Sequence, residues 1–509
     1  MKIFFIRLLL LIACISCCTK SYTQSHHHQN NKHWLRDFQA AANSTVLLNN
    51  ERATIPLKDL QENIASININ AGNAAAFDSL LNKYTSVTSF AGSRYNLDST
   101  LNGLSDDLKF YHTVIVRVSA ERLADKRIMR FILDIQHHKQ LVLFVWGKFK
   151  FLKYAEDIHD DLAAQLIFGG VGAHAKLNRT YTSKYIKGTG NITAPNRIAY
   201  TVPEETGINI EDIEEPINSL VARAIGEKAV PGAVVIILKN GKVIFNKAYG
   251  YHTYDRKEPM LITDIFDLAS VTKVSATTMA IMHLYDQKKL ALDSTFGYYI
   301  PSARNTDKSN IKIKELLLHQ SGLEPDVDLP LLPTDMSTDS SADYPLKAGD
   351  KVFIKKEYFR ESMWPHMLHS KMDTRGKYVY SDLSMTYMKE VVERQSLDQY
   401  VQEHFYGPLG MQTAGFNPLN RFDIKQIVPT EHEEIFRKQW LRGYVHDPTA
   451  ARYGGISGNA GLFASANDLA ILYQMILNGG TYGDVQYLKP ETIHLFTSGQ
   501  SAVSQRGLG

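Results

Sequence analysis

The sequence predicts an α/β fold in two domains: a parallel α/β sandwich, then a domain that opens with an antiparallel hairpin and continues into helices. Strand-like and helix-like runs alternate from about residue 34 to residue 200, which is typical of a parallel sheet covered by helices. A stretch with dense Gly and Pro, residues 187–208, then marks a boundary. After it, Asn240-Gly241 separates two apolar runs, and this pair is a strong signal for a two-residue hairpin turn.

These patterns divide the chain into four parts. We expect a signal peptide over residues 1–24, a tether over 25–33, the sandwich over 34–200 and the second domain over 201–509. A chain of 509 residues is long enough for two or three domains with sizeable cores.

The strands of the sandwich are expected where short runs are rich in β-branched and aromatic residues. Helical patterns separate these runs, as they do in parallel sheets. We expect strands at residues 64–69, 87–90, 113–118 and 141–145, and helices at 74–84 and 121–134.

The second domain begins with an amphipathic pattern over residues 213–225, which predicts a helix. Strands at residues 234–238 and 242–248 then form the hairpin around Asn240-Gly241. A helical lobe is expected from Ser270 to about Tyr406.

The N-terminus has a basic start, a short apolar run and small residues, which indicate a signal peptide. The run is too short for a comfortable transmembrane span. Leu11-Ile12-Ala13-Cys14 resembles a bacterial lipobox, which implies a lipid anchor on Cys14, with Cys17 as an alternative site. Ordinary cleavage near Thr23 is the other interpretation. Either interpretation predicts a location in the cell envelope, in the periplasm or at the outer membrane.

Composition describes an ordinary globular protein, with 44% hydrophobic and 21% charged residues. The net charge of +3 gives no indication of nucleic acid as a partner. All three cysteines, Cys14, Cys17 and Cys18, lie in the leader, so we expect no disulfide and no thiolate metal site in the globular part. No metal and no cofactor is expected.

Ser270 and Lys273 form the pattern that carries chemistry. An apolar lead-in ends at Ser270, and helical spacing follows, so Lys273 lies one turn further on the same face. A serine hydroxyl needs a base before it becomes a good nucleophile, and a buried lysine can be that base. The spacing alone is common by chance, and a second copy, Ser309 to Lys312, lies in a polar stretch that reads as a loop.

The context of Ser270 resembles the serine β-lactamase and penicillin-binding superfamily, in its class C-like branch with esterases and D-amino-acid peptidases. The resemblance runs over residues 208–509, and its matching segments are 230–235, 239–242, 266–273, 316–323 and 458–463. It implies an antiparallel sheet flanked by helices with an all-helical lobe. It also implies an acyl-serine intermediate on Ser270, with Lys273 as base or proton shuttle.

Tyr380-Ser381-Asp382 resembles the superfamily's Tyr-x-Asn element, which implies that Tyr380 is the second proton carrier. Asp382 stands where Asn is commoner. A carboxylate donates no hydrogen bond unless it is protonated, and it would hold the proton on the Lys273 ammonium. The alternative for Tyr380 is a core aromatic beside Tyr378 and Tyr387.

Three further residues are given expected roles from their positions in the sequence. Asn459 occupies a position where similar proteins often carry His, in a Gly-rich turn that favours a structural role. We also group it with Asp382 and Trp364 as substrate-binding candidates. Trp364 follows a long loop rich in Pro and Asp, which could border the cleft. His319 is expected to be a structural histidine near the pocket floor rather than a partner of Ser270.

The region from residue 34 to residue 200 resembles the C-terminal α/β sandwich of family 3 glycoside hydrolases, on segments 44–50, 55–57 and 161–170. That family keeps its nucleophile on a preceding barrel, and there is no room for one here. We therefore expect a non-catalytic platform or a partner-docking module. A glycoside hydrolase accessory subunit is the alternative.

The superfamily's third element, Lys- or His-Thr-Gly, is not found before Gly509, so we expect a chain truncated at the C-terminus and poorly active as written. The function predicted is a serine hydrolase acting on an ester or amide, either a cell-wall peptide or a β-lactam, with peptidoglycan fragments favoured by association with the sandwich. The alternative is a catalytically silent binding protein of the same fold.

Overall fold

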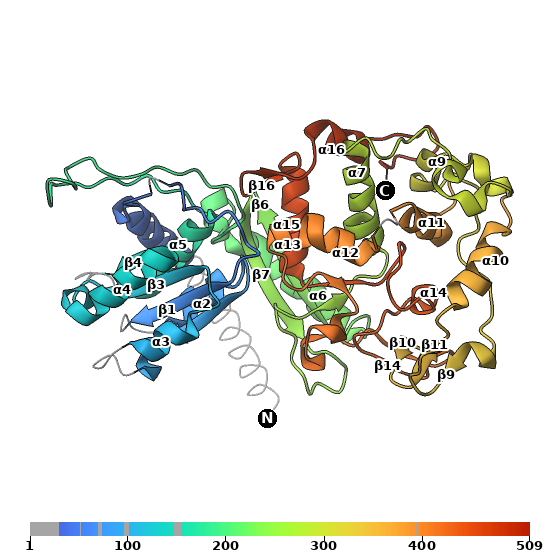
Figure 1. The fold of residues 1–509 in the computed structure, drawn as a ribbon, viewed down its shortest axis with the longest axis horizontal. Coiled ribbons are helices and arrows are strands. Elements are labelled where there is room, and N and C mark those ends of the chain that lie inside the picture. Colours follow the sequence, from blue (N-terminus) through green and yellow to red (C-terminus); the bar gives the residue numbers. More distant parts are fainter. Residues whose placement is uncertain are drawn as a thin grey trace, which may run out of the picture. The chain divides into compact units, whose positions relative to one another are not determined.

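The computed structural model describes residues 30–50, 52–69, 74–95, 101–146, 155–392 and 395–508 (Figure 1). Contacts divide the chain at Gly250 and Tyr251 into two compact units. The division falls after the boundary expected at residue 200, because the hairpin that follows pairs with β5 (Ala199–Tyr200). The signal peptide and Cys14 lie outside the described residues, and residues 30–33 of the expected tether belong to a helix that continues to residue 44.

The sandwich contains a four-stranded sheet in which every pair of neighbours is parallel, with strand order β2-β1-β3-β4. The parallel sheet predicted from the alternating pattern is confirmed, and each expected strand is present. The strands are β1 (Ile64–Ile69), β2 (Val87–Ala91), β3 (Thr113–Ser119) and β4 (Gln140–Trp146).

Helices cover both faces of this sheet, because successive side chains of each strand point to opposite sides. Val114, Val116 and Val118 pack with α3 (Asn102–Asp107) and α4 (Lys126–His138) in one apolar core. On the other face, α2 (Ala75–Leu81) packs against α5 (Ala155–Phe168). There the Arg117 side chain makes a fully buried ion pair with Asp160 of α5, at 2.7 Å.

The first unit also contains the predicted hairpin and the helix that precedes it. Asn240 and Gly241 have φ of 54° and 74°, the values that a type I′ turn requires. β7 pairs antiparallel with β6 and parallel with β5. The elements are α6 (Ile210–Gly226), β6 (Gly232–Lys239) and β7 (Lys242–Gly250).

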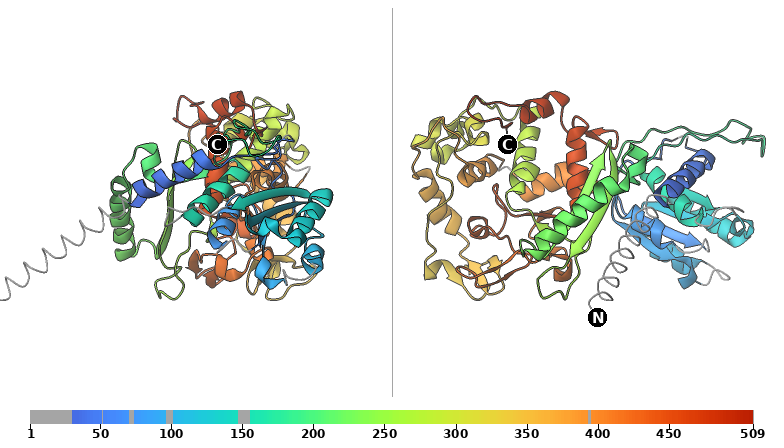
Figure 2. Two further views of the ribbon diagram at one scale, coloured as in Figure 1. Left: turned by 90° about the vertical axis from the view of Figure 1, so that its left-hand side faces the viewer. Right: turned by 180° about the vertical axis from the view of Figure 1, so that it is seen from behind.

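The second unit is mostly helical around a short antiparallel sheet of order β12-β15-β8. Its strands are β8 (Phe266–Asp267), β12 (Gly415–Phe416) and β15 (Leu462–Ala464). The buried helix α7 (Thr278–Asp286) packs against α11 (Asp382–Val392), α12 (Leu397–Val401) and α16 (Pro490–Thr497) (Figures 1 and 2). The other helices are α8 (Phe296–Tyr299), α9 (Ile313–Leu317), α10 (Trp364–Leu368), α13 (Gly407–Leu409), α14 (Pro448–Ala451) and α15 (Ala466–Leu477).

The lobe expected to be all-helical contains a small antiparallel sheet of order β10-β11-β9, and this corrects the prediction. Its strands are only two to four residues long, which is too short for an alternating apolar pattern to be recognised in the sequence. They are β9 (Met336–Ser337), β10 (Leu346–Gly349) and β11 (Val352–Ile354). Two further hairpins are β13 (Glu431–Glu433) with β14 (Gln439–Leu441), and β16 (Thr481–Tyr482) with β17 (Val485–Gln486).

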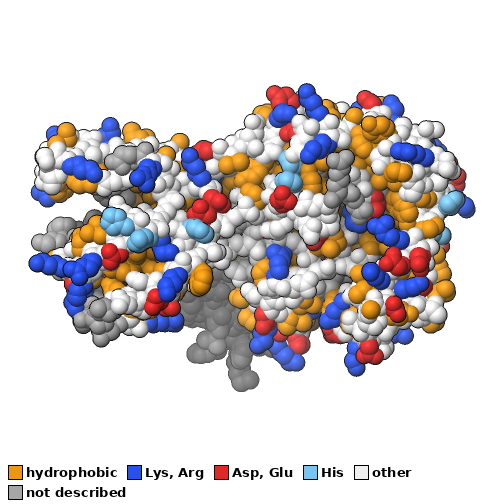
Figure 3. Space-filling model, in the orientation of Figure 1, with side chains coloured by type: hydrophobic (Ala, Val, Ile, Leu, Met, Phe, Trp, Pro, Cys, Tyr) orange, Lys and Arg blue, Asp and Glu red, His pale blue; other side chains and the backbone are white. Residues whose placement is uncertain are grey.

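Charged side chains of both signs are interspersed on the visible face of the second unit, in keeping with the small net charge (Figure 3). Among the described residues, every helix is too short or too polar to cross a bilayer.

Candidate active site

Ser270 follows a strained turn at the end of β8. Ala269, directly before it, has φ of 45°, in the left-handed region that costs an L-residue about 1–2 kcal/mol. The Asp267 carboxylate holds this turn by accepting the Ala269 N–H at 2.9 Å and the His446 N–H at 2.7 Å. Burial raises the pKa of Asp267. The result is an exposed Ser270 side chain at the start of a helical segment.

The helix after Ser270 begins as the sequence predicts, but with an irregular first turn. Lys273–Thr277 form a π-helical turn before α7, and such turns are frequent at functional sites. Buried polar contacts support it: Thr277 Oγ1 donates to the Gly458 carbonyl at 2.7 Å, and Tyr406 OH donates to the Ser275 carbonyl at 2.8 Å. The turn thereby presents Lys273 to the inside of the site.

Lys273 lies among three oxygen acceptors, and its side chain is only 4% exposed. Nζ donates to Ser270 Oγ at 2.9 Å and to the carbonyl of Asn459 at 3.0 Å, and it lies 2.6 Å from Asp382 Oδ1. An ammonium group has three N–H donors, so these acceptors match the charged form of the lysine. The predicted pairing of Ser270 with Lys273 is present, with an exposed hydroxyl and a buried amine.

Asp382 is the first residue of α11, and its backbone N–H donates to the Pro325 carbonyl at 2.7 Å. Burial raises the pKa of its carboxyl, and the neighbouring Lys273 charge opposes that rise. The negative charges of Asp447 and Asp326 raise it further. A carboxyl in this environment takes up a proton more readily than an ordinary aspartate.

Tyr380 presents its ring, not its hydroxyl, to the lysine. Nζ of Lys273 lies 4.8 Å from the ring centroid, within cation–π range. Tyr380 as a residue is 39% exposed, and its ring lies against that of His319, with centroids 4.8 Å apart. Tyr380 therefore borders the site from the solvent side.

His319 is buried and supports the segment that carries Tyr380. Its Nδ1 accepts the Ser381 N–H at 3.1 Å, which places the ring proton of the neutral form on Nε2. Burial, and then the charges of Arg506 and Lys273, lower its pKa to about 4. The expectation of a structural histidine near the pocket floor agrees with this placement.

The structure gives Asn459 and Trp364, two of the expected substrate-binding residues, other side-chain partners. Asn459 is fully buried, its Oδ1 accepts the Ser457 hydroxyl at 2.5 Å, and its carbonyl accepts from Lys273 Nζ. Trp364 packs in an aromatic cluster, and its Nε1 donates to Ser302 Oγ at 3.1 Å. The other rings of that cluster belong to Phe296, Phe359 and Tyr387. The structure thus brings together Ser270, Lys273, Tyr380 and Asp382, and joins Asn459 to them by its backbone.

Sequence reasoning missed the roles of Asp267 and of the Asn459 carbonyl. An aspartate just before a strained turn is a recognisable signal, because Asp side chains often accept the N–H two residues further on. A backbone carbonyl distant in sequence carries no such signal.

The backbone N–H of Ser270 is available to a ligand. Among the hydrogen bonds of the described residues, none is donated by this group, and it lies at the exposed start of a helical segment. An N–H in that position can donate to the oxyanion of a tetrahedral intermediate.

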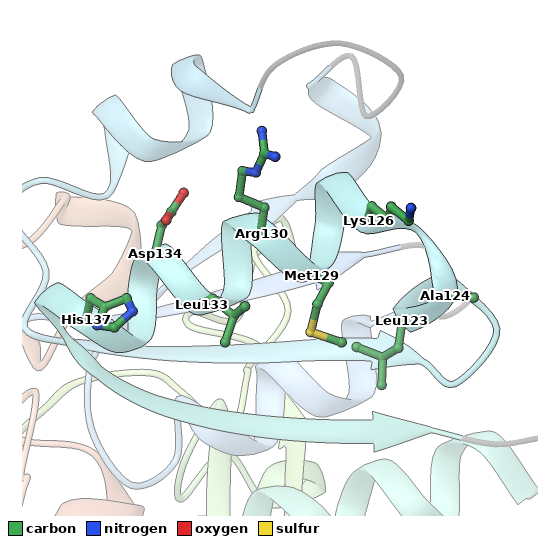
Figure 4. Close-up of a pocket in the computed structure, with 8 residues that line it drawn as sticks. All are labelled: Leu123, Ala124, Lys126, Met129, Arg130, Leu133, Asp134 and His137. Atoms are coloured by element: carbon green, nitrogen blue, oxygen red, sulfur yellow. The ribbon is translucent and has the colours of Figure 1, made fainter.

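The described residues contain no cluster of three metal-ligating side chains. A hollow of about 470 Å³ on α4 of the sandwich has no comparable chemistry. In Figure 4, Met129 and Leu133 point to one side of the helix and Arg130 to the other. That hollow lacks a serine or a cysteine among its lining residues.

Comparisons with known proteins assign the chain to a family. The Beta-lactamase family model matches residues 217–507. A putative D-alanyl-D-alanine carboxypeptidase of Escherichia coli K12 is 31% identical over 335 residues, covering 60% of this chain and 73% of the relative. An N-acetylmuramyl-L-alanine amidase of Bacillus subtilis 168 is 30% identical over 337 residues, covering 61% of this chain and 72% of the relative. Among solved structures, a class C β-lactamase from Rhodobacter sphaeroides is 16% identical, covering 57% of this chain and 73% of that one, with a TM-score of 0.43.

The family match covers more than half of the chain and contains the whole Ser270 site. The chain therefore belongs to the Beta-lactamase family and is a serine hydrolase of that superfamily.

Proposed function

We propose that this enzyme hydrolyses an ester or an amide through an acyl intermediate on Ser270, with Lys273 as the base and Asp382 as the acceptor of the lysine's proton. The observation that carries the proposal is the exposed Ser270 hydroxyl at 2.9 Å from the buried Lys273 amine. A nucleophile and its base within hydrogen-bond reach, with the base oriented by a third group, are the signature of nucleophilic catalysis.

The proposed proton path gives a role to Asp382, which stands where Asn is commoner in the superfamily. In the resting site Lys273 is the ammonium. Its proton passes over 2.6 Å to Asp382, whose neutral form is favoured by burial. The neutral amine then takes the Ser270 proton as Oγ bonds to the substrate carbonyl carbon, and the oxyanion accepts the Ser270 N–H.

Collapse of the tetrahedral intermediate expels the leaving group, which takes the proton from Lys273. Water then attacks the acyl-serine; Lys273 accepts its proton and returns one to Ser270 Oγ. The Tyr380 ring stabilises the ammonium by its π-face, and we propose that its hydroxyl meets the leaving group at the solvent side.

The substrate class we propose is a cell-wall peptide or a related amide, with peptidoglycan fragments favoured and β-lactams as reactive analogues. The names of the E. coli and B. subtilis relatives support this choice. With it we propose a cell-envelope location, a lipid anchor on Cys14, and a non-catalytic docking role for the sandwich, which resembles a family 3 glycoside hydrolase domain.

The test is covalent labelling of the full-length protein. We expect a fluorophosphonate and a labelled penicillin to add one mass increment each, on the peptide that contains Ser270. Ser270→Ala should abolish both adducts.

The chain provides a matched control in its second S-x-x-K copy. Ser309 begins that copy, and Lys312 pairs with Asp293 at 3.4 Å instead of with the serine. Ser309→Ala should label like the unmodified protein. Labelling that survives Ser270→Ala, or that Ser309→Ala removes, would refute the assignment of Ser270; no labelling at all would favour the silent binding protein.

A further inference from the structure

A second cavity, of about 490 Å³, lies in the Tyr251–Gly509 unit. Its volume falls in the range of roughly 300–1,000 Å³ that is usual for small-molecule sites. The walls come from residues 252–258 and from the segment around the β13–β14 hairpin. The lining residues used below are His252, Tyr254, Glu258, Trp440 and Arg442.

Charges on the walls of this cavity are compensated within it. Arg442 Nη1 donates to Glu258 Oε1 at 3.2 Å, and the Arg442 guanidinium holds the pKa of that carboxyl below its usual range. His252 lies between Glu258 and Asp264, at 3.1 Å and 2.8 Å. Lys257 pairs with Asp255 at 3.2 Å. A strongly charged ligand would therefore meet no unpaired opposite charge.

The same cavity exposes two flat aromatic faces. Trp440 is 54% exposed and Tyr254 is 48% exposed, and both line the cavity. Trp440 is held on β14 by an edge contact with His432 of β13, with ring centroids 5.5 Å apart. Two exposed aromatic faces that line one cavity together mark it as a candidate binding site.

We propose that this cavity binds a hexopyranose unit of an oligosaccharide. A pyranose ring is neutral and has an apolar C–H face that packs on an indole or phenol ring. Its hydroxyl rim donates to and accepts from side chains such as Arg442 and Glu258, which keep hydrogen-bonding capacity while their charges cancel.

The cavity lies near the nucleophile along the chain. Asp264, which accepts from His252, precedes Ser270 by six positions, so their Cα atoms lie within about 20 Å of each other. The proposal that the cavity binds a sugar does not depend on the proposed hydrolysis. The choice of an N-acetylglucosamine oligomer as the probe does, because it rests on the proposed peptidoglycan substrate.

The experiment is calorimetric titration of the full-length protein with chitotriose, and with tri-alanine as the peptide alternative. We expect saturable binding of chitotriose and none of tri-alanine. Trp440→Ala and Tyr254→Ala should each weaken chitotriose binding at least tenfold without lowering the melting temperature.

Tyr298→Ala is the matched control, since Tyr298 is a 71% exposed aromatic of the same unit outside the cavity lining. Tyr298→Ala should bind chitotriose like the unmodified protein. Ser270→Ala should also bind it normally, so a failure of the proposed hydrolase activity can be told apart from a failure of sugar binding. Three results would overturn the proposal: no chitotriose heat, unchanged affinity in Trp440→Ala, or tri-alanine binding that Trp440→Ala removes.

Discussion

Asp382→Asn tests the proton path most directly, because it removes one charge and keeps the shape of the side chain. Asp382 Oδ1 lies 2.6 Å from Lys273 Nζ. At that distance, with an effective dielectric constant of about 20, the attraction is about 6 kcal/mol before the cost of burial is subtracted. General acid–base assistance contributes about 10²- to 10⁴-fold in rate, or about 3–5 kcal/mol. This attraction holds the proton on Lys273 in the resting pair, so transfer to Asp382 depends on the burial that favours the neutral carboxyl.

We expect Asp382→Asn to lower kcat/KM at pH 7 by about 10²- to 10⁴-fold, because the amide cannot take the lysine's proton. The unmodified enzyme should lose activity as the pH falls through the pKa of Asp382, which burial raises above 3.8, since protonation of the pair leaves no base. The variant should lack this acidic limb and gain activity toward alkaline pH.

The assay is the pH dependence of kcat/KM with a chromogenic ester, with the melting temperature as a check on folding. Asp326→Asn is the control: Asp326 also raises the pKa of Asp382 but accepts from Thr449 Oγ1 at 2.9 Å. It should change kcat/KM by less than about tenfold, below the range expected of a proton-transfer group. An Asp382→Asn enzyme with unchanged kcat/KM and the same acidic limb would refute the proton path.

Three other substitutions test the supporting structure. The pKa of His319 is about 4 in the folded protein and about 6.5 in the unfolded chain, so the neutral ring stabilises the fold by about 3 kcal/mol above pH 6.5, and this is lost as the pH falls toward 4. In denaturant titrations, the unfolding free energy of His319→Gln should therefore depend less on pH, and an unchanged pH dependence would contradict this. Ala269→Gly should raise the unfolding free energy by up to about 1 kcal/mol in thermal denaturation, because φ of 45° suits glycine, and a loss of stability would contradict the strain. Arg117→Met should lower the unfolding free energy of the sandwich by about 3–5 kcal/mol, because it removes the Arg117 charge that pairs with the buried Asp160, and limited proteolysis should detect the loss. Loss of Ser270 labelling in the folded variant would contradict a non-catalytic role for the sandwich.

Much of the fold was predictable because its elements have strong local signals. The strands at residues 64–69 and 113–118 are buried on both faces and are rich in Ile and Val, and this composition indicates a parallel sheet without tertiary information. The Asn240-Gly241 hairpin was predictable because few residue pairs adopt positive φ at both turn positions. The β10-β11-β9 sheet was not predictable, since strands of two to four residues are too short to show an alternating pattern.

The candidate site divides in the same way. Ser270 and Lys273 could be predicted because they are one helical turn apart in the sequence. Tyr380 and Asp382 could be predicted because they belong to the Tyr-x-Asn-like element. The aromatic neighbours of Trp364 were not predictable, because the length of the preceding loop does not indicate which side chains pack against it. The Asn459 carbonyl was missed because a backbone atom leaves no trace in residue type.

The sequence by itself determined the parallel sheet, the hairpin, and a serine with a lysine one turn later, because propensity and helical spacing act over a few residues. Only the tertiary structure decided that Lys273 is buried among three acceptors and that Asp382 and the Asn459 carbonyl are two of them. Those acceptors come from segments more than a hundred positions away, and burial and electrostatic pairing depend on which segments pack together rather than on their order in the chain.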